Sequence, residues 1–331
     1  MTAFSRVSTQ IMTMVTARAL VIASIAAVAA SGGPSSASPP EATAPVTPAN
    51  IDEALDRASN GGTLVLSDGN YGTLTISNRS FPNKLTIDAR AARFSGIVLR
   101  NVENVDLNGG WIIGPGGRSY GVSMVRTKFI TLRNFQVSGS HRGIVLNQVE
   151  NVTLFNNRLF DLISDGINIA YSKRVRVERN VCRNFRPSPA TYDANGKLLA
   201  DGDHPDCIQA WSRPEYDPTS DLVITNNYMI GQMQGIFLGN HVRDGVDDGG
   251  FDRVSILDNR ITVAFPNGIT VGGARGLQIT GNSISTVPGS VLPNNTSVRV
   301  RAKLYAVDFT DGRICGNTVT DFPDGQGTRP C

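Results

Sequence analysis

The sequence is poor in lysine, histidine, cysteine and tryptophan, and its charges almost cancel. Among 331 residues there are 5 Lys, 3 His, 4 Cys and 2 Trp, and the formal net charge is +3. So small a charge argues against nucleic acid or an anionic membrane as the partner. Four cysteines are too few for a disulfide scaffold, although they suit an oxidising compartment. The hydrophobic fraction of 40% excludes a disordered chain.

Long apolar runs are also missing, apart from one near the N-terminus. Arg6 and Arg18 precede the apolar run Ala19–Ala30, which at about a dozen residues is too short to span a bilayer. This pattern predicts a signal peptide over residues 1–30, whose removal lowers the formal charge to +1. A linker rich in Ser, Pro and Ala follows over Ser31–Ala49. We therefore predict an exported monomer, secreted or periplasmic, with no membrane anchor.

The four cysteines fall into two possible pairs. Cys315 and the terminal Cys331 are close enough in sequence to close a short loop, and such a disulfide stabilises a fold by about 3 kcal/mol. We predict this bond. Cys182 falls at an inward position where a free thiol packs well. Its pairing with Cys207 stays open, and the free thiol is the favoured alternative.

From residue 96 onward the sequence repeats itself. A strand headed by Gly, or once by Cys, recurs at intervals of 22 to 41 residues, starting at Gly96, Gly121, Gly143, Gly166, Cys207, Gly235 and Gly268. A second short strand follows each of them, and an Asn then recurs five residues after that second strand begins, at Asn157, Asn180, Asn227, Asn259 and Asn282. Strands this short cannot bury a face alone, so neighbouring copies must stack.

These repeats predict an all-β solenoid, a single-stranded right-handed parallel β-helix with three short strands per coil. Alternation points Ile144 and Leu146 inward and Val145 outward. The recurrent Asn suits a left-handed turn residue whose amide bonds its counterpart in the next coil. A short helix starting at Asn50, with Glu53 at the capping-box position, would cap the N-terminal end.

A leucine-rich repeat is the alternative fold. Residues 149–159 read VENVTLFNNRL, which fits the L-x-x-L-x-L-x-x-N-x-L pattern. However, the remainder of each segment is a Gly-headed, β-branched strand rather than a helical stretch, and the inward positions are mostly Ile and Val. These features favour the β-helix.

Three insertions break the repeat on adjacent coils. They cover Arg183–Gly202, Ser212–Ser220 and Asn240–Phe251, at the two ends of one sheet. Long loops in a regular solenoid are where function concentrates. We expect them to wall a groove whose floor carries Asn168, Gln209 and Trp211, and an exposed Trp beside amides suits stacking against sugar rings.

The densest chemistry enters the same strand, in the stretch DGDHPDCIQAW over Asp201–Trp211. It offers Asp203, His204 and Asp206, while Asp165 occupies the position equivalent to Asp206 one coil earlier. Carboxylates on adjacent coils lie roughly 5 Å apart and can divide acid and base roles. The alternative is that Asp165 and Asp206 simply bond backbone amides at turns.

Histidine and arginine add to this cluster. The only three histidines, His141, His204 and His241, all fall at ends of this sheet, and a neutral His can move a proton at a sugar carbon or oxygen. Arg142 and Arg243 could neutralise a uronate carboxylate. The stretch DGVDDGG over Asp244–Gly250 could offer oxygen ligands to Ca²⁺, although a solvated acidic turn is favoured and no metal ligand is assigned.

Together, the repeats, the capping helix and GGTLVLSDGNY resemble the pectate-lyase-like superfamily of right-handed β-helices over residues 50–331. The resemblance implies the β-helix fold; lyases, hydrolases, epimerases and non-catalytic binders all use it. Polygalacturonase-type hydrolases carry N-T-D-G-I, D-D-C-I and G-H-G-I on successive coils. Asp165 and Asp206 match the first two motifs, whereas Pro205 replaces the acid of the second and Met233 the His of the third.

We therefore expect an enzyme that cleaves an acidic, uronate-containing polysaccharide by β-elimination. In this hypothesis His204 removes the C5 proton, Asp165 or Asp206 assists the leaving group, and an arginine, or a metal held by Asp203 and Asp206, neutralises the uronate. The predicted substrate contacts are Arg142, Asn168, Gln209, Trp211, His141, His241 and Arg243. A hydrolase, an epimerase or a non-catalytic glycan-binding or structural solenoid is the alternative.

Overall fold

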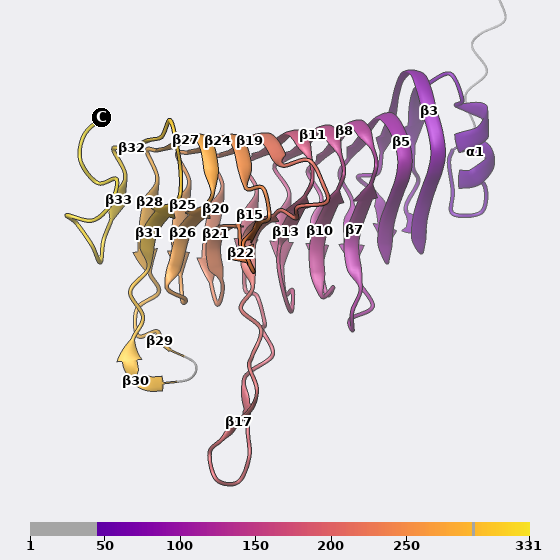
Figure 1. The fold of residues 1–331 in the computed structure, drawn as a ribbon. Coiled ribbons are helices and arrows are strands. Elements are labelled where there is room, and N and C mark those ends of the chain that lie inside the picture. The colour runs from indigo at the N-terminus through magenta and orange to yellow at the C-terminus, as the bar shows by residue number, and fades with distance from the viewer. Residues whose placement is uncertain (1–44, 293–294) are drawn as a thin grey trace, which may run out of the picture. The chain divides into compact units, whose positions relative to one another are not determined.

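A short helix covers the first coil at the N-terminal end of the fold. The computed structural model describes residues 45–292 and 295–331, and in it α1 (Ile51–Arg57) buries Ile51, Ala54 and Leu55 (Figure 1). The predicted signal peptide and most of the predicted linker lie outside the described residues. Val46, however, is buried and pairs in parallel with Leu66, so the end of the predicted linker, residues 45–49, belongs to the fold.

The predicted capping box at this helix is wrong. The Asn50 side chain makes no capping hydrogen bond to the helix and instead accepts a hydrogen bond from the Thr47 amide at 2.7 Å. Glu53 lies 3.4 Å from Arg57, one turn further on. The side chain of Glu53 therefore serves an exposed i,i+4 ion pair rather than the N-terminus.

Beyond the helix, the described strands form three parallel ladders that run the length of the solenoid (Figure 1). The first ladder holds the Gly-headed strands: the first halves of β3 (Thr73–Asp88) and β5 (Gly96–Asn108), then β7 (Tyr120–Val125), β10 (Arg142–Asn147), β13 (Ile167–Ala170), β18 (Asp206–Trp211), β21 (Gln234–Gly239), β26 (Asn267–Gly272) and β31 (Lys303–Val307).

The second ladder contains the strand that follows on each coil: β1 (Gly62–Val65), the second halves of β3 and β5, β8 (Lys128–Arg133), β11 (Glu150–Phe155), β14 (Lys173–Glu178), β19 (Thr219–Thr225), β24 (Phe251–Leu257), β27 (Ala274–Thr280) and β32 (Arg313–Cys315). The third ladder contains β2 (Gly69–Asn70), β4 (Ala92–Phe94), β6 (Trp111–Ile113), β9 (Gln136–Ser138), β12 (Arg158–Phe160), β15 (Val181–Arg183), β20 (Tyr228–Gly231), β25 (Arg260–Val263), β28 (Ser283–Thr286) and β33 (Thr318–Val319).

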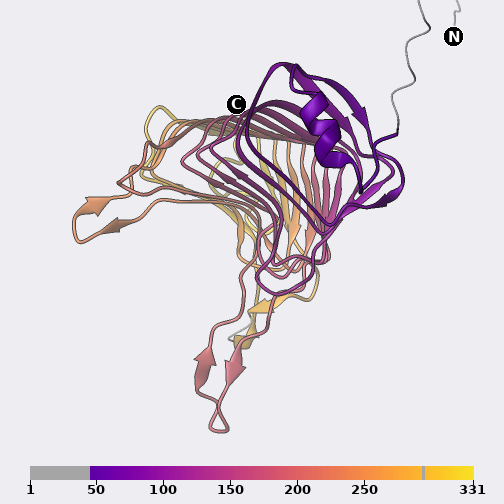
Figure 2. The same ribbon diagram turned by 90° about the vertical axis from the view of Figure 1, so that its right-hand side faces the viewer.

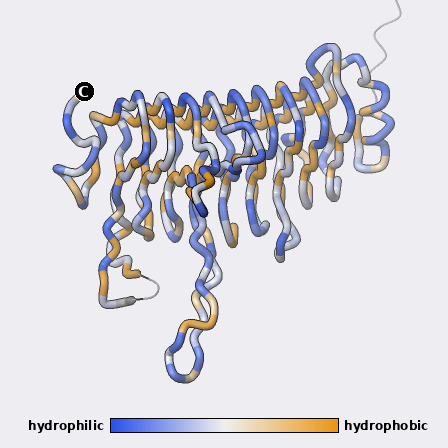
Figure 3. The backbone as a smooth tube through the Cα atoms, viewed as in Figure 1, coloured by the Kyte–Doolittle hydropathy of each residue, from blue (hydrophilic) through white to orange (hydrophobic). Residues whose placement is uncertain are grey.

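Three ladders of parallel strands are the right-handed parallel β-helix that the repeats predict. Side chains alternate as expected: Ile144 and Leu146 are fully buried, and Val145 between them is half-buried. Figure 3 shows hydrophobic segments that recur from coil to coil. The leucine-rich alternative is excluded because the only helix among the described residues is α1, and the segments between ladders are turns.

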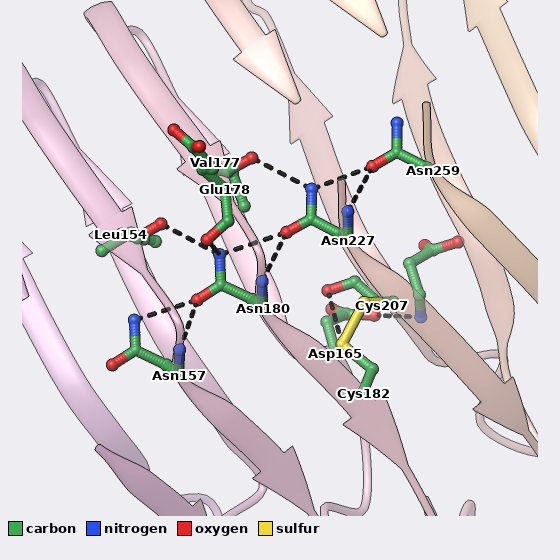
Figure 4. The surroundings of a disulfide bond; sticks show 11 residues. Leu154, Asn157, Asp165, Val177, Glu178, Asn180, Cys182, Cys207, Asn227 and Asn259 are labelled. Carbon is green, nitrogen blue, oxygen red and sulfur yellow. Dashed lines mark hydrogen bonds between the residues drawn. A yellow bond between two sulfur atoms is a disulfide. The ribbon is translucent and has the colours of Figure 1, made fainter. Parts of the chain in front are cut away.

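The recurrent Asn forms a buried ladder of its own at the turn between the second and third ladders. From Asn180 onward, each amide oxygen accepts hydrogen bonds from the backbone and side-chain nitrogens of the preceding member, as Asn180 does from Asn157 at 2.9 and 3.0 Å (Figure 4). The predicted left-handed backbone is wrong for these residues, because the positive φ belongs to the residue before, for example Asn156 at 53° and Arg179 at 56°.

The glycine at the head of each first-ladder strand faces the packed interior. A Cβ on Gly166 would lie 2.6 Å from the carbonyl oxygen of Cys207, and one on Gly143 would lie 2.5 Å from that of Gly166. Cys207 occupies the same inward position, and its sulfur bonds that of Cys182 on β15. The favoured free thiol is therefore wrong; the disulfide ties the third ladder to the first, and Figure 4 shows it beside Asp165.

A second disulfide joins Cys315 to Cys331, the pair that the spacing favours. Insertions supply three hairpins: β16 (Thr191–Tyr192) with β17 (Leu198–Ala200), β22 (Val242–Arg243) with β23 (Val246–Asp247), and β29 (Val291–Leu292) with β30 (Asn295–Arg299). Figure 2 shows β22–β23 projecting away from the other two. The first hairpin lies before β18 and the second after β21, at opposite ends of first-ladder strands.

Candidate functional site

The candidate site lies on the outer face of the first ladder, where β13, β18 and β21 are neighbours. Ile167 pairs with Ile208, so Asp165 and Asp206 occupy equivalent positions, as the spacing predicts. The same register places Asn168 beside Gln209 and Gln209 beside Phe237. Among the residues of the predicted floor, Asn168 is buried at 2% exposure, Gln209 is half-buried and Trp211 is exposed.

Asp165 is held by three neighbours. Its Oδ1 accepts a hydrogen bond from the Asp206 amide at 3.0 Å, and its Oδ2 accepts one from Asn168 Nδ2 at 3.1 Å. Arg142 Nε lies 3.2 Å from Oδ2 but outside hydrogen-bond geometry, so this contact is an ion pair. Asp165 therefore bonds a backbone amide, as the turn alternative requires, and its Oδ2 also faces the Asn168 amide and the Arg142 guanidinium.

Asp206 is in a different environment. Gln209 Nε2 donates to its Oδ2 at 2.8 Å, whereas its Oδ1 is buried and has no hydrogen-bond partner among the described residues. Burial raises the pKa of Asp206 well above its usual range, the negative charge of Asp165 raises it further, and the Gln209 hydrogen bond lowers it in part. Burial and the neighbouring Asp165 thus favour the protonated form of Asp206, which is the form that a general acid requires.

Both carboxyl groups are nearly inaccessible to solvent. Asp165 is 4% exposed and Asp206 is 2% exposed. A ligand therefore reaches them only where the surrounding side chains move aside, and a proton of Asp206 is shielded from water in the resting structure.

A row of amides continues from this pair along the ladder. Asn168 Nδ2 also donates to Gln209 Oε1 at 2.9 Å, and Asn267 Nδ2 donates to Gln234 Oε1 further along. The side-chain oxygen of Asn168 is buried and unpartnered in the described structure. Sequence reasoning found Asn168 and Gln209 but missed Gln234 and Asn267. Their register with Asp206 was the available signal.

His204 lies two residues before Asp206 in the chain, but its side chain is exposed. Its ring is exposed, lies 3.7 Å from Asp201 and meets Phe265 edge to face with the centroids 5.8 Å apart. Asp203 accepts a hydrogen bond from the Ser188 amide at 3.3 Å, which closes the base of the β16–β17 insertion. His141 is half-buried, and its backbone carbonyl accepts a bond from Ser164.

The remaining predicted contacts lie at the other end of the strands. His241 and Arg243 are exposed and flank the start of the β22–β23 hairpin, and the six residues of β18 separate the two ends by roughly 16 Å. His241 is therefore not grouped with His141 and His204. Trp211, at this far end, is 38% exposed, and Arg213 lies 5.8 Å from its ring centroid.

An aromatic pair that sequence reasoning missed accompanies Trp211. Tyr171 and Tyr216 stack with ring centroids 4.1 Å apart, and Tyr171 directly follows Ala170, the ladder neighbour of Trp211. Burial raises the pKa of the Tyr171 hydroxyl, an effect that Arg213 partly offsets. Tyr216 comes from the predicted insertion Ser212–Ser220, whose path the repeat pattern does not define.

Metal ligation finds little support in the described residues. They contain no group of three or more His, Cys, Asp or Glu side chains placed to hold a metal ion, and all four cysteines are in disulfides. In the stretch considered for Ca²⁺, Asp247 accepts bonds from the Gly249 amide and Asn240, which lower its pKa. That carboxylate stabilises a turn.

The chain is similar to one family model over part of its length. Residues 56–198 match the family described as "Periplasmic copper-binding protein (NosD)". Copper is bound in proteins by Cys, Met and His; all four cysteines are in disulfides, and the described residues contain no group of three or more His, Cys, Asp or Glu placed to hold a metal. No curated protein matches the chain.

Solved structures with a similar fold include phage tailspikes and a bacterial adhesin. A tailspike variant of E. coli bacteriophage HK620, in complex with a pentasaccharide, is 14% identical with a TM-score of 0.50, covering 81% of this chain and 58% of its own. A second variant of that tailspike is also 14% identical, with a TM-score of 0.49, and the match covers 81% of this chain and 57% of the tailspike chain. The surface adhesin PfbA of Streptococcus pneumoniae is 10% identical, with a TM-score of 0.44, and the match covers 72% of this chain and 86% of the adhesin chain. The chain thus spans little more than half of the tailspike chain, and these likenesses concern the fold.

No helix in the described part of the chain has the length and apolar character needed to cross a membrane.

Proposed function

We propose that the protein is an exported enzyme that cleaves an acidic polysaccharide by β-elimination. The observation that carries this proposal is the unequal carboxyl pair: Asp206, whose pKa is raised, beside Asp165, which Arg142 pairs. A carboxyl group whose pKa is raised keeps its proton to a higher pH and can therefore act as a general acid. Export is supported by the signal-like pattern of residues 1–30 and by the similarity of residues 56–198 to a family of periplasmic proteins.

In the proposed reaction, His204 takes the C5 proton of a uronate as general base. The C4–O bond breaks as the C4=C5 double bond forms, and Asp206 gives its proton to the departing oxygen. Arg142 supplies positive charge near the uronate carboxylate, which acidifies the C5 proton. Asn168 and Gln209 orient the sugar, while Trp211, His241 and Arg243 contact units about 16 Å away along the strand.

Support for a carbohydrate comes from the composition of the outer face. The amides of Asn168 and Gln209 pair across β13 and β18, and Trp211 follows Gln209 two residues further along β18, a combination suited to sugar hydroxyls and sugar faces. The tailspike with a TM-score of 0.50 holds a pentasaccharide on the same type of fold. That ligand is a property of the tailspike, and it agrees with the class of substrate proposed here.

The proposal is tested with a panel of polysaccharides. Purified protein is incubated with polygalacturonate, alginate, hyaluronate and xylan, and each reaction is followed for ultraviolet absorbance and for new reducing ends. β-Elimination produces both signals in step. Reducing ends without absorbance would replace the lyase with a hydrolase, and altered uronate stereochemistry at constant chain length would replace it with an epimerase.

A second candidate is a non-catalytic glycan-binding solenoid. It is favoured by the burial of Asp165 and Asp206, which limits direct contact with a substrate. This candidate predicts no turnover of any polymer, together with binding that survives His204→Ala and Asp206→Ala. The enzyme proposal predicts turnover that those two variants abolish.

A further inference from the structure

A hollow lies on the second ladder, near the N-terminal end of the solenoid. It has a volume of about 600 Å³, within the range of small-ligand sites. The hollow is lined by Ser80, Phe81, Pro82, Lys84, Glu103, Asn104, Phe129, Thr131 and Asn151. These residues come from β3, β5, β8 and β11, at the start of the second ladder.

One wall of the hollow exists because β3 bulges. Ser80 pairs with Glu103 and Leu85 pairs with Val105, so the four residues 81–84 stand opposite Asn104 alone. The Asn104 side chain donates to the carbonyl of Phe81 at 3.0 Å, and Ser80 donates to Glu103 at 3.2 Å. The bulge is thereby fixed against the floor rather than left loose.

Phe129 is the unusual residue of the floor. Its φ is 55°, a conformation that bulky side chains adopt only at a cost in free energy, and it is 53% exposed. Equivalent positions on the adjacent coils hold Asn104 and Asn151, which suit this backbone. Tyr171, the other aromatic residue with positive φ, stacks on Tyr216. No ring or cation contact accompanies Phe129 within the described chain.

Hydrogen-bonding groups flank this ring on both sides. Asn151 Oδ1 accepts a bond from Arg174, which leaves its Nδ2 without a partner among the described residues, and Asn104 Oδ1 is likewise unpartnered there. Lys84 is exposed and forms no ion pair in the described structure. An aromatic face between a free amide donor and a free amide acceptor matches the apolar face and hydroxyl rim of a pyranose.

We propose that this hollow is a second saccharide-binding site, which holds one or two sugar units of a polysaccharide against the ring of Phe129. Asn104, Asn151 and Lys84 bond the hydroxyl groups of the sugar. The floor strand β8 precedes β13 and β18 by two and three coils, which places the hollow roughly 10–15 Å from Asp165 and Asp206 along the solenoid axis. Binding here does not depend on the reaction proposed for that pair.

The test is affinity electrophoresis of the full protein through native gels that contain polygalacturonate, alginate, xylan or dextran. Wild-type protein is expected to be retarded by at least one polymer. Phe129→Asn, which restores the residue type of the neighbouring coils, is expected to bind that polymer about tenfold more weakly, because it loses the stacking face. Phe129→Trp keeps an aromatic face and is expected to retain binding.

A matched control is Tyr228→Asn, which removes an exposed aromatic residue from the third ladder and is expected to leave retardation unchanged. Thermal unfolding separates binding from folding: Phe129→Asn is expected to melt at or above the wild-type temperature, because Asn relieves the backbone strain. Retardation of Phe129→Asn equal to wild type, or wild-type protein that no polymer retards, would overturn the proposal. Turnover without retardation would overturn this site and leave the proposed reaction standing.

Discussion

Asp206 is a carboxyl group that folding removes from water, and this links stability to pH. Its pKa in the folded chain lies above the ordinary value of 3.8, so the folded state binds this proton more tightly than the unfolded state. The stability gained from the protonated group is complete below about pH 4 and is lost as the pH rises from there through the raised pKa. Above about pH 4, burial of the Asp206 side chain therefore lowers the free energy of unfolding.

Asp206→Asn is expected to remove this dependence. The amide oxygen still accepts the bond from Gln209, and no charge has to be buried at any pH. Relative to wild type, the melting temperature of the variant is expected to rise between pH 4 and pH 7, as measured by circular dichroism. Asp244→Asn, at an exposed carboxylate, serves as the control with parallel profiles. A constant difference between wild type and Asp206→Asn across this range would contradict the argument.

Asn180 illustrates how one side chain serves three coils. Its oxygen accepts two bonds from Asn157, and its nitrogen donates to the Leu154 carbonyl at 2.9 Å and to Asn227 at 3.2 Å. All of these groups are buried, and each group left unpaired costs about 1–3 kcal/mol. Each Asn of the ladder therefore needs an Asn at the equivalent position of the neighbouring coil.

Asn180→Ala is expected to lower the free energy of unfolding by about 3 kcal/mol or more, because several buried groups lose their partners at once. Chemical denaturation followed by fluorescence measures the change. Asn195→Ala, in the exposed β16–β17 turn, is expected to change stability by no more than about 0.5 kcal/mol. Equal effects of the two substitutions would show that the buried ladder is not a special source of stability.

At the scale of elements, the disulfide between β15 and β18 fixes the strand that carries the candidate site. Cys182 and Cys207 close a loop of 25 residues that contains the β16–β17 hairpin. Because Cys207 directly follows Asp206, the bond also restrains the backbone at the carboxyl pair. The insertion can therefore be long while the start of β18 stays in register.

The double variant Cys182→Ser with Cys207→Ser is expected to lose about 3 kcal/mol of stability, from the entropy of the opened loop. The pair Cys315→Ser with Cys331→Ser, at the end of the chain, closes a loop of 16 residues and is expected to lose a similar amount. If the account is right, only the first variant also lowers turnover or glycan binding at the carboxyl pair. A loss of function from the second variant alone would contradict it.

The repeats predicted the coils well because stacked strands must share one register. Once Ile167 is equivalent to Ile208, the positions of Asp165, Asn168 and Gln209 follow without further information. The turn residue was misassigned for a related reason: spacing identifies the Asn column but does not say whether Asn157 or Asn156 carries the positive φ. The Cys182–Cys207 bond depends on two inward side chains from different ladders, which periodicity alone does not relate.

Insertions and bulges were beyond prediction because they have no repeat to define them. Tyr216 reaches Tyr171 from an irregular loop, and the hollow beside Phe129 depends on a four-residue bulge in β3. The separation of His241 from the other two histidines follows from which end of a strand each one flanks. That distinction could have been drawn from the sequence, because His141 and His204 precede their strands and His241 follows its strand.

At the scale of the whole solenoid, the proposed functions use two separate stretches of one regular scaffold. The carboxyl pair lies on the first ladder at β13 and β18, and the hollow lies at the start of the second ladder between β3 and β11. Stacked coils keep the spacing between these places constant because each coil contacts only its neighbours. A long polymer could then contact both places without any movement of one relative to the other.

The central claim is that Asp206 donates a proton to a sugar oxygen while His204 removes one from carbon. It is tested most directly by the initial rate of unsaturated-product formation, measured by ultraviolet absorbance, for wild type, Asp206→Asn and His204→Ala on the best polymer of the panel. The account predicts activity in wild type and a loss of at least about 100-fold in each variant. Undiminished rates in Asp206→Asn, or no unsaturated product from wild type on any polymer, would contradict it.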